Sequence, residues 1–385
     1  MNNTRGTLGL TMATILGLNA VIGAGIFTYP AALACTAGPA GLITFSLVVV
    51  MVLLIAMGMA RMALTRPTNA IFYDHAALWA GKFGGITATL LYAGGLIAAL
   101  GLMARMAGSY LTIYAPALSS IGWGSLVLVA IVALSFTSMR ATKWLQIILI
   151  VLTILPLVLI TALCASKASI AHLTPFAPHG VGGIIAAIKI VLFGFFGFEA
   201  IPAFSSFMRD PQKNIPRAMI LTIILTGIIY FAFIASIMLA IPHTAFTSPQ
   251  MSVSPLLLGL FPTQRWLVAC IDWAIIITII GTLHSMLLAV VALITSVLGH
   301  PKAHNYVLLT VGALLVLGCI SITNIGLSFG LAALGISAAY AVTLVPLTRR
   351  SILHEQAAPL LGSVGIAACA VLFMCGLFGA IGAII

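Results

Sequence analysis

The chain has 385 residues, of which 62% are hydrophobic and only 5% are charged. Soluble globular domains carry about 25% charged residues, so this composition excludes a water-soluble protein. Apolar stretches of about 20 residues, the length that crosses a bilayer as a helix, fill nearly the whole chain and leave no room for a soluble catalytic domain. The net charge of +11 has a topological explanation, because basic residues gather beside membrane spans. No nucleic-acid partner is therefore expected.

The apolar runs predict an all-α polytopic membrane protein with about eleven transmembrane helices. They are long, continuous and rich in Leu, Ile and Ala, whereas a membrane β-barrel requires alternating segments of about 10 residues. An uncleaved first span is expected rather than a signal peptide, because no small-residue cleavage site follows the first apolar run. The predicted spans are 8–34, 38–60, 84–109, 122–139, 143–165, 182–208, 216–241, 264–298, 305–322, 325–348 and 359–383.

The basic residues predict the orientation in the membrane, because Lys and Arg near span ends are retained on the cytoplasmic side. With the N-terminus inside, all but four of the 16 Lys and Arg residues face the cytoplasm. The exceptions, Arg105, Lys167, Lys189 and Arg265, fall in outer loops or in the outer halves of spans. We expect a multi-pass protein of the plasma (inner) membrane with a cytoplasmic N-terminus and, for an odd number of spans, a C-terminus on the opposite side.

Two predicted spans contain glycine-rich segments near their middle. Residues 19–27 read Asn-Ala-Val-Ile-Gly-Ala-Gly-Ile-Phe, and residues 192–200 read Leu-Phe-Gly-Phe-Phe-Gly-Phe-Glu-Ala. Gly lowers helix stability by about 1 kcal/mol relative to Ala, and in a membrane the backbone leaves helical geometry only where it is buried in protein or lines a cavity. When each segment is taken alone, close helix packing explains it better than a binding site does.

The positions of the two segments favour a binding site over packing. One lies in the first of the first five spans and the other in the first of the next five, which is the pattern of transporters built from inverted repeats. An unwound backbone offers N–H groups to an anion and carbonyl groups to a cation, and the half-helix dipoles reinforce both. A zwitterionic amino acid carries both charges, so the pair predicts an amino-acid site.

The residues around both segments carry a family resemblance. Residues 22–27 (Ile-Gly-Ala-Gly-Ile-Phe) are followed by Pro30 and by Ala-Gly-Pro-Ala at 37–40, and the second segment is followed by Arg-Asp-Pro-Gln-Lys-Asn-Ile-Pro-Arg-Ala at 209–218. These motifs resemble the first and sixth helices of the amino acid-polyamine-organocation (APC) transporters. The resemblance implies a LeuT-like fold with discontinuous helices 1 and 6. It also implies a five-plus-five inverted repeat, with residues 1–165 and 166–348 as the repeats and 349–385 as an additional helix.

The resemblance also implies the residues of the site. Backbone N–H groups around Gly23 would hold a substrate carboxylate, and nearby carbonyl groups would receive the amino group. Phe193 stands at the family's aromatic gate, and Thr153 aligns with a lysine that some proton-coupled relatives carry. The implied substrate-binding residues are Ala20, Val21, Ile22, Gly23, Ala24, Gly25, Phe193, Gly194, Phe196 and Gly197.

Charged residues inside spans are functional candidates, since a charge at mid-helix costs about 2.5–3.5 kcal/mol on insertion scales. Glu199 follows the second glycine-rich segment and is either a proton-coupling residue or a carboxyl group that ties the broken helix through hydrogen bonds. Arg105, Lys189 and Asp272 all fall in the outer half of the bundle. We expect Asp272 to pair with Lys189 or Arg105 as an outer gate or a stabilising ion pair, with snorkelling of the basic side chains as the alternative.

Helix 8 contributes a second group of candidates. His284 is either a proton relay or a hydrogen-bonded packing residue, and Ser285 with nearby Thr282 is a candidate for a sodium site with carbonyl groups of helix 1. The expected coupling ion is the proton, with sodium as the alternative. No cofactor is expected, and the six cysteines, which lack paired spacing, are expected to pack as small apolar residues.

These observations predict a secondary amino-acid transporter that works by alternating access, through proton-coupled symport or substrate exchange, and not an enzyme. The chain shows no nucleotide-binding glycine loop and no nucleophile–base pair on a soluble scaffold. The Phe-rich second segment favours a neutral apolar or aromatic amino acid over a dibasic one. The alternatives are an exporter or sodium-coupled transporter of the same fold, and a non-transporting membrane sensor or intramembrane enzyme. The expected partners are an amino acid or amine and the lipid bilayer, in a monomer or a homodimer.

Overall fold

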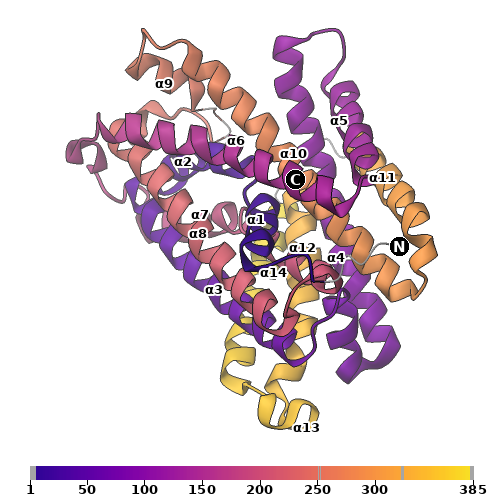
Figure 1. Cartoon of the computed structure of the whole chain (residues 1–385). Helices are drawn as coiled ribbons and strands as arrows, with labels where there is room; N and C mark the ends of the chain where they lie inside the picture. The colour runs from indigo at the N-terminus through magenta and orange to yellow at the C-terminus, as the bar shows by residue number, and fades with distance from the viewer. Residues whose placement is uncertain (1–5, 250, 252, 322–324, 382–385) are drawn as a thin grey trace.

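The computed structural model describes residues 6–249, 251, 253–321 and 325–381, without the side chains at 189, 193, 301, 325, 326, 329, 355 and 379. It is an all-α bundle, as predicted (Figure 1). The α-helices are α1 (Leu10–Val21), α2 (Gly25–Ala37), α3 (Gly41–Thr65), α4 (Ile71–Tyr114), α5 (Ser120–Ser135), α6 (Met139–Ala165), α7 (Gly180–Phe193), α8 (Pro211–Ala240), α9 (Ser254–Leu260), α10 (Trp266–Leu298), α11 (His304–Ser321), α12 (Ile325–Thr348), α13 (Arg350–Leu353) and α14 (Pro359–Ile381). Short 3-10 helices are η1 (Gly38–Ala40), η2 (Ile170–Leu173), η3 (Phe198–Phe207), η4 (His243–Ala245), η5 (Pro301–Ala303) and η6 (His354–Gln356).

Each predicted span coincides with one helix or with a broken pair of helices. Within the described residues, eight helical segments are long and apolar enough to cross a membrane, and α1, α5 and α7 are shorter apolar helices. Besides short helices such as α13, two features were not expected from the sequence. The α4 helix begins well before the predicted span and has a non-helical residue at Gly81, and α9 lies in the loop before α10. The division of the chain into repeats at residues 165 and 348 stays a prediction.

Both glycine-rich segments interrupt their helices, as predicted. The first helix ends at Val21, where Ile22 is extended, and resumes as α2 at Gly25. The second ends at Phe193 and continues after Gly197 as the ten-residue 3-10 helix η3, which contains Pro202. A 3-10 run of that length is unusual and often marks a functional hinge.

The broken helix α1 lies in the interior of the bundle (Figure 1), where it contacts α6, α8, α10 and η3. The outer faces of the bundle carry large apolar side chains in contact with the surroundings, such as Trp144 on α6 and Phe378 on α14. An apolar exterior around a packed interior is what a lipid solvent requires. The helices α9 and α13 lie at opposite ends of the bundle (Figure 1).

Candidate substrate site

The two helix breaks meet in the middle of the bundle because glycine lets their backbones approach. Gly197 has a φ of 130°, and a Cβ atom there would lie 2.5 Å from the carbonyl oxygen of Ala20. A Cβ atom at Gly194 would lie only 1.5 Å from the hydroxyl oxygen of Tyr29. That hydroxyl donates a hydrogen bond to the carbonyl of Val191, at 3.2 Å. A side chain at either glycine would therefore push the two breaks apart.

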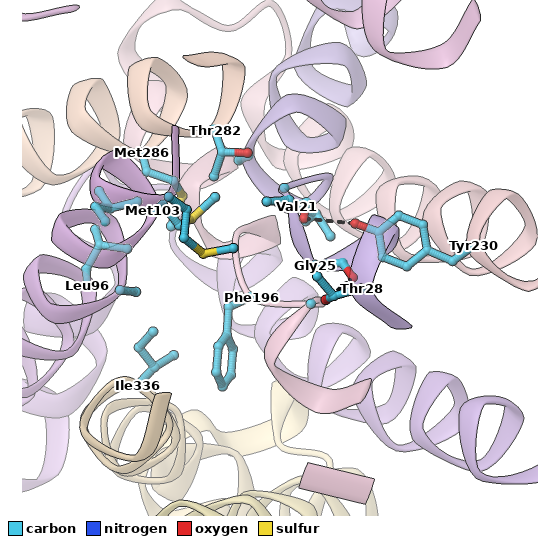
Figure 2. A pocket seen from close by; sticks show the side chains of 17 residues that line it. Val21, Gly25, Thr28, Leu96, Met103, Phe196, Tyr230, Thr282, Met286 and Ile336 are labelled. Carbon is cyan, nitrogen blue, oxygen red and sulfur yellow. Dashed lines mark hydrogen bonds between the residues drawn. The ribbon is translucent and has the colours of Figure 1, made fainter. Parts of the chain in front are cut away.

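A cavity of about 60 Å³ opens beside the apposed breaks (Figure 2). It exceeds the roughly 10–15 Å³ that one water molecule needs, so it has room for part of a small solute. The lining residues come from both breaks and from α4, α8, α10 and α12. They are Ala20, Val21, Gly23, Ala24, Gly25, Thr28, Leu96, Ala99, Leu100, Met103, Met106, Gly194, Phe196, Tyr230, Thr282, Met286 and Ile336.

One side of the cavity is formed by polar backbone. Gly23 and Ala24 precede the first turn of α2, where N–H groups have no intrahelical partner and the helix dipole favours negative charge. The carbonyl of Val21, at the end of α1, accepts a hydrogen bond from the Tyr230 hydroxyl at 3.3 Å (Figure 2). This side therefore presents both donors and acceptors without any charged side chain.

The opposite side of the cavity is apolar. Figure 2 shows Leu96, Met103 and Met286 across from Val21 and Gly25, with Phe196 and Ile336 next to each other at the edge. Methionine side chains are flexible and polarisable, so they adapt to apolar groups of different shapes. None of the lining residues is acidic or basic. The cavity is thus polar where the helices break and apolar elsewhere.

A buried polar cluster lies behind the first break. The Nδ2 atom of Asn19 donates to the main-chain oxygen of Gln146 at 2.8 Å and to its Oε1 at 2.6 Å. The Gln146 Oε1 also accepts from the Ser285 hydroxyl at 2.9 Å, and its Nε2 lies 2.8 Å from Nδ1 of His284. These four residues, here called the Asn19 cluster, join α1, α6 and α10.

Thr282 forms a second contact between α10 and the first break. Its hydroxyl lies 2.9 Å from the carbonyl oxygen of Asn19, 3.0 Å from that of Ile22 and 3.2 Å from that of Thr278. A hydroxyl group has a single proton to donate. Three carbonyl oxygens therefore converge on one donor, which leaves an excess of acceptors beside the cavity.

Comparisons with known proteins agree with this architecture. A family model described as amino acid permease matches residues 8–300. The chain belongs to the amino acid permease family. A search of curated proteins finds no match.

Solved structures share the permease's fold at low sequence identity. A manganese transporter from Eremococcus coleocola is 12% identical, with a TM-score of 0.72 over 100% of this chain and 91% of that chain. MhsT in complex with L-phenylalanine is 16% identical, with a TM-score of 0.70 over 97% and 98%. A Na⁺-coupled sialic acid symporter is 15% identical, with a TM-score of 0.58 over 97% and 90%. The permease therefore has the LeuT-like transporter fold predicted from its motifs.

The structure brings most of the predicted binding residues of the permease to the cavity. Ile22 is buried outside its lining, and Gly197 packs against Ala20. The side chain of Phe193, the predicted aromatic gate, lies outside the described residues. Seven of the predicted residues line the cavity, and their role in binding stays a prediction: Ala20, Val21, Gly23, Ala24, Gly25, Gly194 and Phe196.

Sequence reasoning missed the apolar wall and two members of the Asn19 cluster, Asn19 and Gln146, whereas it named His284 and Ser285 as candidates. Leu96, Met103 and Ile336 resemble any other buried apolar residue of a spanning helix, and no motif marks them. Asn19 and Gln146 are uncharged polar residues in apolar runs, and that signal alone distinguishes them. The hydroxyl oxygen of Thr153, the residue aligned with the family's lysine, lies 3.3 Å from the hydroxyl oxygen of Thr278 on α10.

Glu199 lies fully inside the bundle at the second break. Its Oε2 accepts a hydrogen bond from the backbone N–H of Gly197 at 2.8 Å. This bond lies within the broken helix, as in one of the two alternatives that the sequence left open for Glu199. The hydroxyl groups of Tyr92 and Tyr340 interact electrostatically with the carboxyl group. A cavity of about 10 Å³, separate from the substrate cavity, borders Glu199, Tyr92 and Asn69. Proton coupling by Glu199 stays a prediction.

The expected ion pair between Asp272 and Arg105 is wrong for this structure. The Asp272 carboxylate accepts from the Tyr114 hydroxyl at 2.9 Å and from the Ser254 hydroxyl at 3.4 Å. Arg105 precedes Tyr114 by nine residues on α4, which is about 13–14 Å along a helix, and therefore lies too deep to reach. The Lys189 side chain, the other predicted partner, lies outside the described residues.

The far ends of the two broken helices are tied to each other. Leu8 donates to the carbonyl of Phe207 at 3.0 Å, and its own carbonyl accepts from the N–H of Arg209 at 2.8 Å. Lys143 on α6 donates to the carbonyl of Thr7 at 2.6 Å. At the end of the bundle that is predicted to be cytoplasmic, these bonds hold the segment before α1 against the end of η3 and against α6.

Proposed function

We propose that this permease is a secondary transporter of neutral apolar amino acids that works by alternating access. The single observation that carries the proposal is the cavity at the two apposed breaks, polar on one side and apolar on the other. An amino acid has the same division, with two opposite charges at one end and a side chain at the other.

The polar side suits the charged end of such a substrate. The substrate carboxylate binds the N–H groups of Gly23 and Ala24, because the start of α2 favours negative charge. The substrate amino group is received by carbonyl oxygens at the end of α1, such as that of Ala20. This assignment follows the division of donors and acceptors at a discontinuous helix.

The apolar side favours a substrate with an uncharged side chain. A second charge on the substrate would face Leu96, Met103 and Met286, and burying an unpaired charge is strongly unfavourable. Side chains of the size of Leu, Met or Phe match a wall of methionine and branched apolar residues. Dibasic and acidic amino acids are poor substrates on this proposal.

The proposed mode of transport is proton-coupled symport or substrate exchange, and export is the same cycle run under opposite gradients. The N-terminus is proposed to be cytoplasmic. Sodium coupling is the second candidate, and the Thr282 contacts favour it specifically. Three carbonyl oxygens face one hydroxyl proton there, and oxygen ligands of this kind suit a hard cation.

Uptake and counterflow of radiolabelled amino acids in proteoliposomes test the proposal. Leucine, methionine and phenylalanine are expected to exchange, and arginine and glutamate are not. An imposed pH gradient drives uptake if the proton is coupled, and a sodium gradient at equal pH drives it in the second candidate. The absence of uptake and exchange for every amino acid would show that the proposal is wrong.

A matched pair of variants ties that activity to the cavity. Met103→Trp fills the apolar side and is expected to reduce leucine counterflow more than 10-fold. Met57→Trp makes the same change on α3 at a side chain that is 40% exposed on the outer face, and it is expected to retain counterflow. Equal effects of the two substitutions would place the substrate elsewhere.

A further inference from the structure

A groove separate from the substrate cavity runs between α12 and α14. Its volume is about 350 Å³, compared with about 60 Å³ for the substrate cavity. Phe373 and Met374, which line it from α14, are 39% and 46% exposed, so the groove opens toward the outer face of the bundle. The other lining residues on which the argument depends are Ser337, Ala341, Val342 and Ile366.

The groove has an apolar wall at the depth of lipid acyl chains. None of its described lining residues is charged, and the Ser337 hydroxyl donates to the carbonyl of Ala333 within α12. The helix α12 ends at Thr348. At a rise of 1.5 Å per residue, Val342 lies about 9 Å and Ser337 about 16 Å below that end. One leaflet contributes about 15 Å of hydrocarbon, so a phospholipid chain reaches the same depth.

An arginine lies where the groove meets the end of α12. The guanidinium carbon of Arg349 lies 5.7 Å from the centre of the Trp79 ring, within the range of about 6 Å for a cation–π contact. The indole nitrogen of Trp79 donates to the carbonyl of Val342 at 3.0 Å, and Val342 lines the groove. One tryptophan therefore connects the guanidinium group to the wall of the groove.

This end of the bundle, which is predicted to be cytoplasmic, presents positive charge. Arg349 and Arg350 are both exposed, and Nε of Arg61 donates to the carbonyl of Gln356 in the same region, at 3.3 Å. Figure 1 shows α13, which begins at Arg350, at this end of the bundle. A guanidinium group stacked on an aromatic ring can still donate from its edge, and its N–H groups match the oxygens of a phosphate group.

We propose that this groove is a binding site for an anionic phospholipid. One acyl chain lies between α12 and α14, the phosphate group accepts hydrogen bonds from Arg349, and Arg350 adds positive charge. Anionic lipids gather at basic residues beside membrane helices on the cytoplasmic side. The two arginines therefore favour an anionic lipid over a zwitterionic lipid with the same chains.

The charges disfavour a second copy of the permease as the occupant. Two copies in one membrane have the same orientation, so a two-fold contact at this groove would place the arginines of both copies at the same depth. Like charges brought together across an interface are unfavourable. An anionic lipid instead neutralises them.

The bound lipid is expected to act on the substrate cavity through α12. Ile336 lines the cavity and the next residue, Ser337, lines the groove. An acyl chain in the groove therefore packs against the helix that also forms the apolar side of the cavity, and anionic lipid is expected to increase transport. This consequence rests on the proposed transport function, whereas the binding of the lipid does not.

Native mass spectrometry of the purified permease tests the role of charge. Phosphatidylglycerol and phosphatidylcholine with identical palmitoyl and oleoyl chains are supplied in equal amounts. We expect the wild type to retain phosphatidylglycerol about fivefold more than phosphatidylcholine. Arg349→Gln is expected to lose this preference, and Arg140→Gln, the same change at an exposed arginine on α6, is expected to keep it. No preference in the wild type, or an unchanged preference in Arg349→Gln, would overturn the proposal.

A pair of tryptophan variants tests the groove itself. Ala370 lines the groove and is exposed, so Ala370→Trp is expected to fill it and to reduce retention of phosphatidylglycerol more than fivefold. Val371→Trp makes the same change at the next residue of α14, which is 41% exposed and outside the described lining, and it is expected to retain the lipid. Wild-type retention in Ala370→Trp would overturn the proposal. A lipid-free wild-type dimer that Ala370→Trp dissociates would also overturn it, because a second copy would then occupy the groove.

Leucine counterflow tests the consequence for transport. The vesicles contain phosphatidylcholine alone or with one quarter phosphatidylglycerol. The wild-type rate is expected to rise at least threefold with phosphatidylglycerol, and the rate of Arg349→Gln is expected not to rise. An equal rise in both would refute the link between this site and transport. If no amino acid is transported in either vesicle, the proposed function fails, and the mass spectra still decide whether the lipid binds.

Discussion

Glu199 at the second break and His284 behind the first break are both buried ionisable residues, but the partners of their hydrogen bonds lie at very different distances along the chain. Glu199 accepts from Gly197, two residues away in the same broken helix. His284 bonds to Gln146, which lies 138 residues earlier and in turn holds Asn19, a further 127 residues earlier. The hydrogen bond of Glu199 is local and stabilises the second break. The Asn19 cluster instead connects α1 to α6 and α10. The comparison indicates that loss of Glu199 should alter the geometry of the second break, and loss of the cluster should alter movement of α1.

The largest effect is expected at the second break. Gly197→Ala requires a Cβ atom 2.5 Å from the carbonyl oxygen of Ala20, at a φ of 130°. The two breaks must then separate, and the Gly197 N–H moves away from Glu199. We expect transport to fall more than 100-fold in proteoliposome counterflow. Gly182→Ala on α7 meets no atom within 4 Å and is the control. Wild-type transport in Gly197→Ala would show that the breaks need not touch.

The next substitution separates the two roles of Glu199. Glu199→Gln keeps an oxygen that accepts from the Gly197 N–H, whereas Glu199→Ala leaves that N–H buried and unpaired. An unsatisfied buried group costs about 1–3 kcal/mol, so Glu199→Ala should unfold at lower temperature than Glu199→Gln.

Gradient-driven uptake completes the test of Glu199. If the carboxyl group carries the coupled proton, Glu199→Gln keeps counterflow and loses uptake driven by a pH gradient. Full pH-driven uptake in Glu199→Gln would leave the carboxyl group with the structural role alone.

Asn19→Ala tests the long-range side of the comparison. The substitution removes the two hydrogen bonds that Asn19 donates to Gln146 and should cost about 1–3 kcal/mol of stability, because buried acceptors lose their donor. Hydrogen exchange measured by mass spectrometry is expected to rise across α1 more than across η3. Faster exchange at η3 than at α1 would contradict the assignment of the cluster to α1.

The smallest effect is expected at Asp272, whose partners lie near the end of the bundle. Tyr114→Phe removes one hydrogen bond to the carboxylate, and Tyr114 is 41% exposed, so water can replace it. We expect a loss of at most about 1 kcal/mol and a less than threefold change in transport rate. A larger loss of transport would indicate an outer gate at Tyr114 and Asp272.

Local sequence features predicted the parts of the site that depend on local backbone chemistry. The glycines at 23, 25, 194 and 197 marked both breaks, and the apolar runs marked the helices that contain them. The error at Asp272 has a different cause. The expected pair assumed that Arg105 and Asp272, on separate helices, lie at the same depth in the membrane. In the structure Tyr114 lies at the level of Asp272, and Arg105 is nine residues away from Tyr114 along α4.

The sequence by itself determined the membrane class, the positions of the spans, the two broken helices and the family, because each follows from composition or from residues adjacent in the chain. Only the tertiary structure decided the apolar wall of the cavity and the Asn19 cluster. Met103, Met286 and Ile336 line the same cavity as Gly25, and Asn19 bonds to Gln146, 127 residues away in the chain. Such contacts depend on how helices pack, and helix packing in a membrane is set by shape and by hydrogen bonds between distant residues.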